Sequence, residues 1–412
     1  MKRILMVAFH YPPYKGGSGV HRTSKLANFL PDHGWLPTVL TATHRAYPNA
    51  GNAQLDQGEN RVRVIRAFAL DTARHISFRN SYPRFLALPD RWASWWPNAV
   101  FAGLHLIRKE HPAVIWSTYP IATAHLIGLT LHRLTGTPWV ADFRDPMTDF
   151  SYPPEPSVFR CYRWIERQTV QHSDRLIFTT ESTRKMYLNR FPELTREKSI
   201  VIHNGYDEND FKDLPFPGTK LDNEPMRLVH AGALYPEERD PRPFFGAVTR
   251  LKQEGRLDAV SLRIELRATG VDSYYESMIR DYRIEDIVHL LPALPYRQAL
   301  EDCASADGLL LFQAASCNHQ IPAKVYEYLR LRRPILALTP GNSDTAVLLA
   351  ETGGATITDI ADEDLIYNTL PNFLSALMNN SHSLPDMNRT QCYTRKSQAT
   401  EFASCFSSLS GK

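Results

Sequence analysis

The sequence predicts an α/β protein made of two Rossmann-like, doubly wound domains that face each other across a cleft. Short apolar runs, typical of strands buried on both faces, alternate with helical stretches along the chain. The alternation stops at a Pro-rich, mixed segment, residues 213–225, and then starts again. A length of 412 residues allows two domains with a sizeable core in each.

The first unit opens with an apolar run at residues 4–9. The polar and Pro-rich residues 10–13 follow without a small-residue cleavage pattern, so the run predicts a buried strand rather than a signal peptide. A helix is expected over about residues 20–30. The remaining strands of this unit are expected at residues 35–40, 62–67, 114–117, 138–142, 175–179 and 200–202. They define an N-terminal domain of residues 1–205.

The second unit repeats the pattern over residues 206–390. Its strands are expected at residues 226–230, 262–266, 287–290, 308–312 and 334–338. Residues 391–412 are expected to form a C-terminal helix that packs back toward the N-terminal domain. Ligands of doubly wound sheets bind beyond the carboxyl ends of the strands, so the polar residues that follow each strand are the candidates for a functional site.

Composition excludes several classes of protein. Hydrophobic residues make up 43% of the chain and charged residues 22%, which is typical of a globular protein. No apolar run approaches the roughly 20 residues that span a bilayer. The five cysteines are scattered without paired spacing, which argues against a disulfide framework or a zinc site and for a reducing, cytoplasmic compartment.

The net charge of +3 hides an asymmetry between the two halves. Residues 1–205 carry 26 Lys and Arg against 15 Asp and Glu, whereas residues 206–412 carry 21 against 29. The basic half either faces an anionic partner or is simply a solvated surface. Within it, residues 78–97 mix aromatic side chains with arginines. This mixture suits an anionic membrane interface, an amphipathic acceptor or single-stranded nucleic acid, and ordinary packing of the tryptophans explains it equally well.

A glycine-rich loop follows the first strand and precedes a helix: Gly16, Gly17, Ser18 and Gly19. Glycines there let the backbone approach a ligand, and a helix N-terminus offers free N–H groups to an anion. The loop is neither a dinucleotide fingerprint, because the third glycine is missing, nor a P-loop, because no Gly-Lys-Ser/Thr follows. It predicts either a phosphate or sugar contact or an ordinary loop.

Charged residues also cluster at the end of the strand at residues 138–142. Asp142, Arg144 and Asp145 lie there, and buried charges are costly unless they are paired. The cluster is either an Asp–Arg pair that fixes a loop or a polar group that orients a hydroxyl acceptor. Asn204 ends another strand and turns with a glycine, which a tight turn alone explains.

In the second unit, Gly232 follows the first strand and Arg239 comes seven residues later. A glycine that permits close approach and an arginine with fixed donors could clamp a diphosphate, and an exposed arginine in a polar loop is the alternative. Lys324 and Glu327 lie three apart at the start of a predicted helix, so they share one face. They could meet a phosphate and a ribose, or they could form a plain ion pair.

Metal ligands are not expected. The acidic run at residues 362–364 lies where a helix begins, so it predicts capping and compensation of the helix dipole. The 15 histidines show no ligand spacing and no convincing catalytic triad. The sequence therefore predicts neither a metal nor a resident cofactor.

With these residues placed, the chain resembles the retaining GT-B glycosyltransferases of family four along nearly its whole length, and most of all the bacterial branch that builds surface polysaccharides. Five segments carry the resemblance in order. They are residues 10–20 (HYPPYKGGSGV), 142–146 (DFRDP), 204–207 (NGYD), Gly232 with 239–241 (RDP), and 322–328 (PAKVYEY).

The resemblance implies roles for residues of both domains. The N-terminal domain would bind the acceptor and the C-terminal domain the nucleotide-diphosphate sugar. Arg239 and Lys324 would neutralise the diphosphate as it leaves, Glu327 would hold the ribose, and the backbone near Leu294 would meet the base. The remaining contacts to the donor would come from Gly16, Gly17, Asn204, Gly232 and His319. Arg144 and Asp142 would act at the reacting centre, with Ser18 and Asp145 on the acceptor side.

The chain departs from the family pattern at three places. His319 stands where the first of a pair of glutamates would fall, Arg239 stands alone where an Arg and a Lys are common, and Arg144 replaces a histidine. The resemblance still implies a metal-independent hexosyltransferase, acting on a glycan or polyprenyl-diphosphate-linked acceptor at the inner face of the membrane, and no nucleic-acid partner. A sugar-nucleotide epimerase of related fold and a catalytically silent nucleotide-sugar binding protein are the alternatives.

Overall fold

The computed structural model describes residues 1–14, 17–48, 62–79, 81–149, 152–214 and 224–410. The chain divides into two compact units. Unit 1 comprises Met1–Asn204 together with Arg395–Lys412, and unit 2 comprises Gly205–Thr394. The last helix thus belongs to unit 1, and the chain passes from unit 2 back to unit 1 between Thr394 and Arg395, a few residues beyond the expected boundary.

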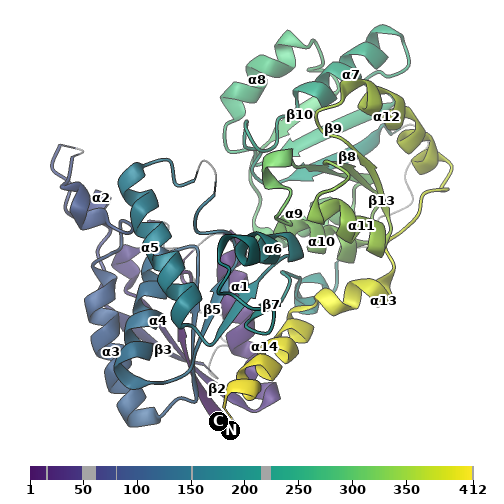
Figure 1. The fold of residues 1–412 in the computed structure, drawn as a ribbon. Helices are drawn as coiled ribbons and strands as arrows, with labels where there is room; N and C mark the ends of the chain where they lie inside the picture. Colours follow the sequence, from purple (N-terminus) through teal and green to yellow (C-terminus); the bar gives the residue numbers. More distant parts are fainter. Residues whose placement is uncertain (15–16, 49–61, 80, 150–151, 215–223, 411–412) are drawn as a thin grey trace. The chain divides into compact units, whose positions relative to one another are not determined.

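Unit 1 is a parallel sheet of seven strands in the order β3-β2-β1-β4-β5-β6-β7, with helices on both faces (Figure 1). The strands are β1 (Lys2–Val7), β2 (Trp35–Ala42), β3 (Arg63–Ala67), β4 (Val114–Thr118), β5 (Trp139–Phe143), β6 (Arg175–Phe178) and β7 (Ser199–Val201). The helices are α1 (Gly17–Phe29), α2 (Thr72–His75), α3 (Trp95–Glu110), α4 (Ala122–Thr135), α5 (Pro156–His172), α6 (Glu181–Arg190) and α14 (Arg395–Leu409).

Alternate side chains of each strand in unit 1 enter two separate cores, as strand geometry requires. On one face, Leu5 and Val7 pack with buried residues of α3, α4 and α5. On the other face, Ile4 and Met6 pack with residues of α1 and α14, including Phe402 and Phe406. The C-terminal helix therefore completes the core of unit 1.

Unit 2 is a parallel sheet of six strands in the order β10-β9-β8-β11-β12-β13. The strands are β8 (Met226–Ala231), β9 (Leu262–Arg267), β10 (Val288–Leu291), β11 (Gly308–Phe312), β12 (Ile335–Leu338) and β13 (Ala355–Thr358). The helices are α7 (Arg242–Gln253), α8 (Asp272–Asp281), α9 (Tyr296–Ala304), α10 (Ala323–Leu331), α11 (Asp344–Thr352), α12 (Glu363–Met378) and α13 (Met387–Thr390). The prediction of two parallel, Rossmann-like sheets is confirmed, and β13 is a strand that the sequence analysis missed.

Each sheet has one point where the order of strands reverses. In unit 1 it lies between β1 and β4, and in unit 2 between β8 and β11. The loops that leave the two strands at such a point run to opposite faces, which opens a crevice at the carboxyl end of the sheet. The fold therefore marks the loops after β8 and β11, and those after β1 and β4, as places to look for a site.

Candidate functional site

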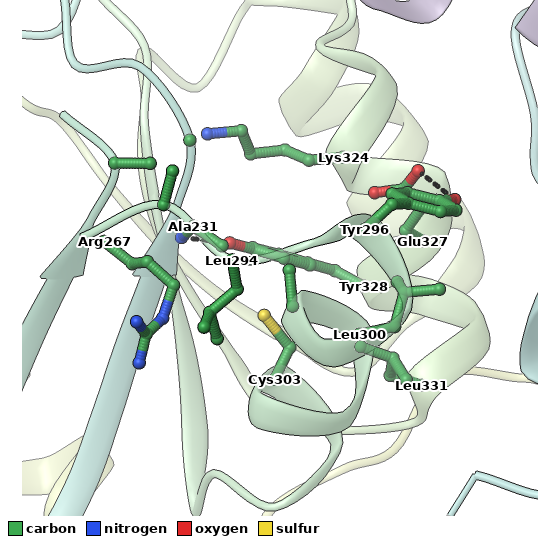
Figure 2. Close-up of a pocket in the computed structure, with 14 residues that line it drawn as sticks. Ala231, Arg267, Leu294, Tyr296, Leu300, Cys303, Lys324, Glu327, Tyr328 and Leu331 are labelled. Carbon is green, nitrogen blue, oxygen red and sulfur yellow. Dashed lines mark hydrogen bonds between the residues drawn. The ribbon is translucent and has the colours of Figure 1, made fainter. Parts of the chain in front are cut away.

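A cavity of about 290 Å³ lies at the carboxyl ends of β8 and β9, beside the reversal point of unit 2 (Figure 2). Four predicted site residues line it: Gly232, Leu294, Lys324 and Glu327. The other lining residues are Ala231, Arg267, Ala268, Ala293, Tyr296, Ala299, Leu300, Cys303, Tyr328 and Leu331. The structure thus brings together predicted residues that lie up to 95 positions apart in the sequence, the span from 232 to 327.

Lys324 reaches the cavity from the first turn of α10. Its ammonium nitrogen is 3.1 Å from Nε2 of His230, and Nδ1 of His230 is 2.9 Å from the carbonyl oxygen of Leu310. An Nδ1–H donor to that carbonyl leaves Nε2 as an acceptor for Lys324. The buried His230 therefore holds the position of the lysine, a role that the sequence analysis did not assign.

The pKa of Lys324 is lowered to about 7, first by burial and then by the positive charge of Arg239. Burial, and next the charge of Lys324, also hold the pKa of His230 well below its usual value, so the imidazole is neutral. Lys324 also lies at the N-terminus of α10, the positive end of the helix dipole. Within the residues that the structure describes, no side chain caps this helix end with a hydrogen bond. An anion in the cavity would relieve all of these unfavourable interactions.

Gly232 makes room for Lys324. Its φ of +108° lies in the region that favours glycine, and a Cβ atom added there would come 3.1 Å from Nζ of Lys324. A side chain at this position would strain the backbone and crowd the ammonium group. The glycine after β8 is therefore required by the position of the lysine.

Glu327 lies one turn further along α10 and accepts a hydrogen bond of 2.8 Å from the hydroxyl of Tyr296 (Figure 2). The buried Tyr328 accepts a hydrogen bond of 3.1 Å from the backbone N–H of Ala231, which ties α10 to β8. Leu294 and other apolar side chains form much of the remaining wall. One cavity therefore offers a cation, a carboxylate and apolar surface.

Arg239 does not line the cavity. It lies in the loop between β8 and α7, where its guanidinium donates to the carbonyl of Ala233 and lies 4.9 Å from the ring centroid of Tyr235. Its charge nevertheless lowers the pKa of Lys324, so the two cations act on the same region.

His319 is half-buried in the loop that connects β11 to α10. Its Nε2 atom is 3.4 Å from the side-chain amide nitrogen of Gln320. The shape of this loop depends on Gln313, which directly follows β11. The side-chain amide of Gln313 donates to the carbonyls of Cys317 and Gln320 at 2.7 and 2.8 Å. A buried polar residue at the end of an apolar strand is the signal that could have identified it.

In unit 1, the acid predicted at the reacting centre is engaged in an ion pair. Asp142 is fully buried and accepts two hydrogen bonds from Arg22, at 3.0 and 2.9 Å, and one from Thr118. Arg22 also donates to the carbonyls of Ile202 and His203 and to the side chain of Asn204. Asp142 and Arg22 thus form a buried Asp–Arg pair, and the sequence analysis did not name this arginine. The expected role of Asp142 at the reacting centre stays a prediction.

Arg144 packs against the start of α1. A Cβ atom on Gly19 would clash with its guanidinium, so that glycine is required by the arginine. Burial and the charge of Arg144 lower the pKa of His10 to about 4, and the His10 ring stacks on Tyr14 at 4.7 Å. Asp145 is half-buried next to Arg144. Arg144, Asp145 and His10 thus form a polar cluster after β1 and β5.

The glycine-rich loop is described only in part. Gly16 and the side chain of Ser18 lie outside the described residues. Gly17 is exposed, has a φ of +69° and begins α1. It therefore lies at a helix N-terminus, as expected.

The acidic run at residues 362–364 acts as predicted. Asp362 caps α12 by accepting from the N–H of Leu365, and Glu363 and Asp364 pair with Arg250. Among the described residues, no three His, Cys, Asp or Glu side chains gather as metal ligands could. In the same part of the chain, no helix has the length and apolar character needed to cross a membrane.

Comparison with known proteins agrees with this architecture. Residues 16–205 match the family described as "Glycosyl transferase 4-like domain". No curated protein sequence gives a significant match. Several solved structures are similar over nearly the full length of both chains. A sucrose-phosphate synthase from Thermosynechococcus elongatus has a TM-score of 0.68 at 14% identity and covers 99% of each chain.

Two further structures show the same likeness. An α,α-trehalose-phosphate synthase from Burkholderia vietnamiensis has a TM-score of 0.64 at 14% identity, with 100% of each chain covered. The Anabaena protein HepE, solved in complex with UDP-glucose, has a TM-score of 0.60 at 13% identity, with 100% of this chain and 98% of that chain covered. The chain therefore has the GT-B fold, and residues 16–205 are similar to the glycosyl transferase 4-like family.

Proposed function

We propose that the protein is a retaining, metal-independent glycosyltransferase that moves a sugar from a nucleotide-diphosphate donor to a glycan or lipid-linked acceptor. The observation that carries the proposal is the cavity after β8 and β9, where the cation of Lys324, the carboxylate of Glu327 and an apolar wall converge. These three features match the diphosphate, ribose and base of a nucleotide. The glycosyl transferase 4-like domain and the GT-B fold support the same reaction class.

In the proposed complex, the diphosphate lies at Lys324, where Gly232 leaves the approach open. Arg239 approaches the same phosphates from the β8–α7 loop. As the bond to the anomeric carbon breaks, negative charge grows on the leaving diphosphate, and the two cations stabilise it. Glu327 accepts hydrogen bonds from the ribose hydroxyls, and the backbone near Leu294 contacts the base.

The N-terminal unit would bind the acceptor and supply further contacts to the donor. Gly16, Gly17 and Asn204 would approach the donor, and the polar cluster of Arg144 and Asp145, with Ser18, would orient the hydroxyl of the acceptor. His319 would replace the usual glutamate near the sugar. Asp142 would act beside Arg144 at the reacting centre, and its ion pair with Arg22 holds the carboxylate in place.

Charge distribution and cysteine content support a particular acceptor and place of action. Residues 1–205 contain 26 basic and 15 acidic residues. This excess of positive charge favours an anionic partner, such as a polyprenyl-diphosphate-linked glycan at the inner face of the membrane. The five scattered cysteines, which show no paired spacing in the sequence, favour a reducing, cytoplasmic compartment. A lipid-linked glycan acceptor and a cytoplasmic place of action together lead us to propose a role in polysaccharide biosynthesis.

A thermal-shift panel of UDP, GDP, ADP and dTDP sugars tests donor binding. The nucleotide that binds raises Tm as RT ln(1 + [L]/Kd), so one base is expected to stand out. With that donor, Lys324→Met and Arg239→Met are each expected to lower the transfer rate by about 10²–10³, the effect of losing one group that stabilises developing charge. Arg280→Met, an exposed cation on α8, is the matched control.

The same assay separates the alternatives. An epimerase would convert the nucleotide sugar with no acceptor present, and a silent binding protein would show the thermal shift without turnover. If no nucleotide sugar shifts Tm, or if both variants keep the rate of the wild-type protein, the proposal is wrong.

A further inference from the structure

The outer surfaces of α3, α4 and α5 form a strongly basic surface, here called the α3–α5 face. These helices lie side by side over one face of the unit 1 sheet (Figure 1). They carry six cations and two acids. The cations are Arg108, Lys109, Arg133, Arg160, Arg163 and Arg167. Of the acids, Glu166 is fully buried and Glu110 pairs with Arg63, so neither offsets the exposed positive charge.

Each helix of this face also exposes a large apolar side chain. Phe101 on α3 is 79% exposed, Leu134 on α4 is 63% exposed and Trp164 on α5 is 51% exposed. Single exposed apolar residues are ordinary, but a set on three adjacent helices among six cations is typical of a surface that enters a lipid interface.

A groove of about 440 Å³ lies at the α5 edge of this face. Four arginines, Arg160, Arg163, Arg167 and Arg190, line it together with one acid, Glu193, and with aromatic side chains that include Trp164. Arg163 and Arg190 bind the buried carboxylate of Glu166 at 3.3 and 3.0 Å. Arg160 and Arg167 have no acidic partner within 4.0 Å in the described part of the chain. Their charges are therefore available to an external anion.

We propose that the α3–α5 face docks on an anionic bilayer, with a lipid phosphate in the groove and the exposed apolar side chains in the headgroup region. Guanidinium groups bind phosphate through fixed, paired donors, and clusters of cations bind anionic leaflets. Leu134 favours a bilayer over a nucleic acid, because an aliphatic side chain enters a lipid headgroup region but gains nothing from a phosphate backbone. The proposal rests on the proposed function for the expected membrane contact, but its test does not require the reaction.

The proposal places the membrane contact on the α3–α5 face and not on residues 78–97. Trp95 of that segment is fully buried and Trp92 packs against the core, so ordinary packing explains these two tryptophans, whereas Trp96 is 39% exposed at the start of α3. Phe78 and Phe85 are exposed, but they lie before α3.

Co-sedimentation of the full chain with vesicles tests the proposal. We expect binding to vesicles that contain phosphatidylglycerol, no binding to pure phosphatidylcholine, and weaker binding as salt increases. Each cation near an anionic surface strengthens binding about fivefold, so the double variant Arg160→Ser/Arg167→Ser is expected to bind roughly 30-fold more weakly. Phe101→Ser/Leu134→Ser is expected to weaken binding at every salt concentration, because it removes the apolar contribution.

The control is Arg280→Ser/Lys396→Ser, which removes the same charge from α8 and α14. Lys396 lies on the helix that packs against the opposite face of the unit 1 sheet. Equal loss of binding in this control, or no binding of the wild-type protein to anionic vesicles at low salt, would overturn the proposal. So would tighter binding to a single-stranded oligonucleotide than to vesicles. Because neither donor nor acceptor is present, none of these outcomes depends on catalysis.

Discussion

At the scale of single residues, the protonation of Lys324 connects the structure of the cavity to its chemistry. Burial and the charge of Arg239 lower the pKa of this lysine to about 7, against 10.5 for a free side chain. The unfolded chain therefore binds more protons than the folded one between about pH 7 and pH 10.5, and the contribution of Lys324 to the free energy of unfolding rises with pH in that window. In the folded protein, the amine of Lys324 is therefore only partly protonated near neutral pH until an anion binds beside it.

We predict that binding of the nucleotide sugar takes up a proton. A diphosphate beside Lys324 favours the ammonium form and raises its pKa, so at about pH 8 binding converts a largely neutral amine into a cation. Titration calorimetry in buffers of different ionisation enthalpy measures this uptake, which is expected to approach one proton. The Lys324→Met variant is expected to bind the same ligand more weakly and without uptake. Equal uptake in the wild-type protein and the variant would assign the proton to another group.

At the scale of elements, α10 delivers two functional groups from one face. Its first turn carries Lys324, and Glu327 follows at the spacing that places both side chains on the same side. The hydrogen bond from Tyr296 on α9 orients the carboxylate. The helix can therefore contact a phosphate and a ribose of the same ligand.

This arrangement predicts a selective effect of Glu327→Gln. The variant is expected to lower the affinity for the nucleotide by about 10–100-fold, the usual value of hydrogen bonds to a charged group, and to leave the affinity for inorganic pyrophosphate unchanged. Calorimetry with the ribonucleotide and its deoxyribose analogue, each with the wild-type protein and with Glu327→Gln, separates the ribose contact from other effects. The deoxyribose analogue is expected to bind the variant and the wild-type protein with similar affinity. Tyr296→Phe is expected to have a smaller effect, because it removes only the orienting hydroxyl.

Arg22 connects several elements of unit 1 in a similar way. From α1 it binds Asp142 at the end of β5 and the carbonyls that follow β7, and its guanidinium lies 5.1 Å from the ring centroid of Phe402 on α14. One buried ion pair thus fixes the C-terminal helix and the end of the first sheet.

We predict that Arg22→Met lowers the free energy of unfolding by about 3–5 kcal/mol, because it leaves Asp142 buried without a cation. Urea unfolding followed by circular dichroism measures the change. The double variant Arg22→Met/Asp142→Leu is expected to recover part of the loss, since it removes the unpaired charge as well. A cost below about 1 kcal/mol for Arg22→Met would mean that Asp142 is not held by this pair.

At the scale of the whole molecule, the alternation of apolar runs and helices was enough to predict both parallel sheets. It missed β13, because that strand is short, lies at the sheet edge and is rich in threonine rather than in large apolar residues. Positions near the end of a strand or the start of a helix placed Gly232, Lys324 and Glu327 among the candidates, whereas Leu294 was named only because of the resemblance to the glycosyltransferase family.

The partners of these residues could not be predicted in the same way. His230 lies within β8 and looks like an ordinary strand residue until the fold brings Lys324 against it from 94 positions away. Arg22 lies within α1, and only the packing of α1 across β5 shows that it pairs with Asp142. Periodicity identifies elements, but contacts between distant elements depend on how the elements pack.

Removal of metal ions by chelation tests whether Lys324 and Arg239 alone stabilise the leaving diphosphate. If Lys324 and Arg239 together neutralise the leaving diphosphate, no divalent cation is needed for that purpose, and EDTA is expected to leave the transfer rate within about twofold of the untreated enzyme. The measurement is the initial rate of sugar transfer in metal-free buffer, before and after addition of Mg²⁺ or Mn²⁺. Loss of about 10³ in rate on chelation, with recovery on adding metal, would show that the two cations do not suffice. In that case the roles proposed for Lys324 and Arg239 would shift from leaving-group stabilisation to binding of the donor alone.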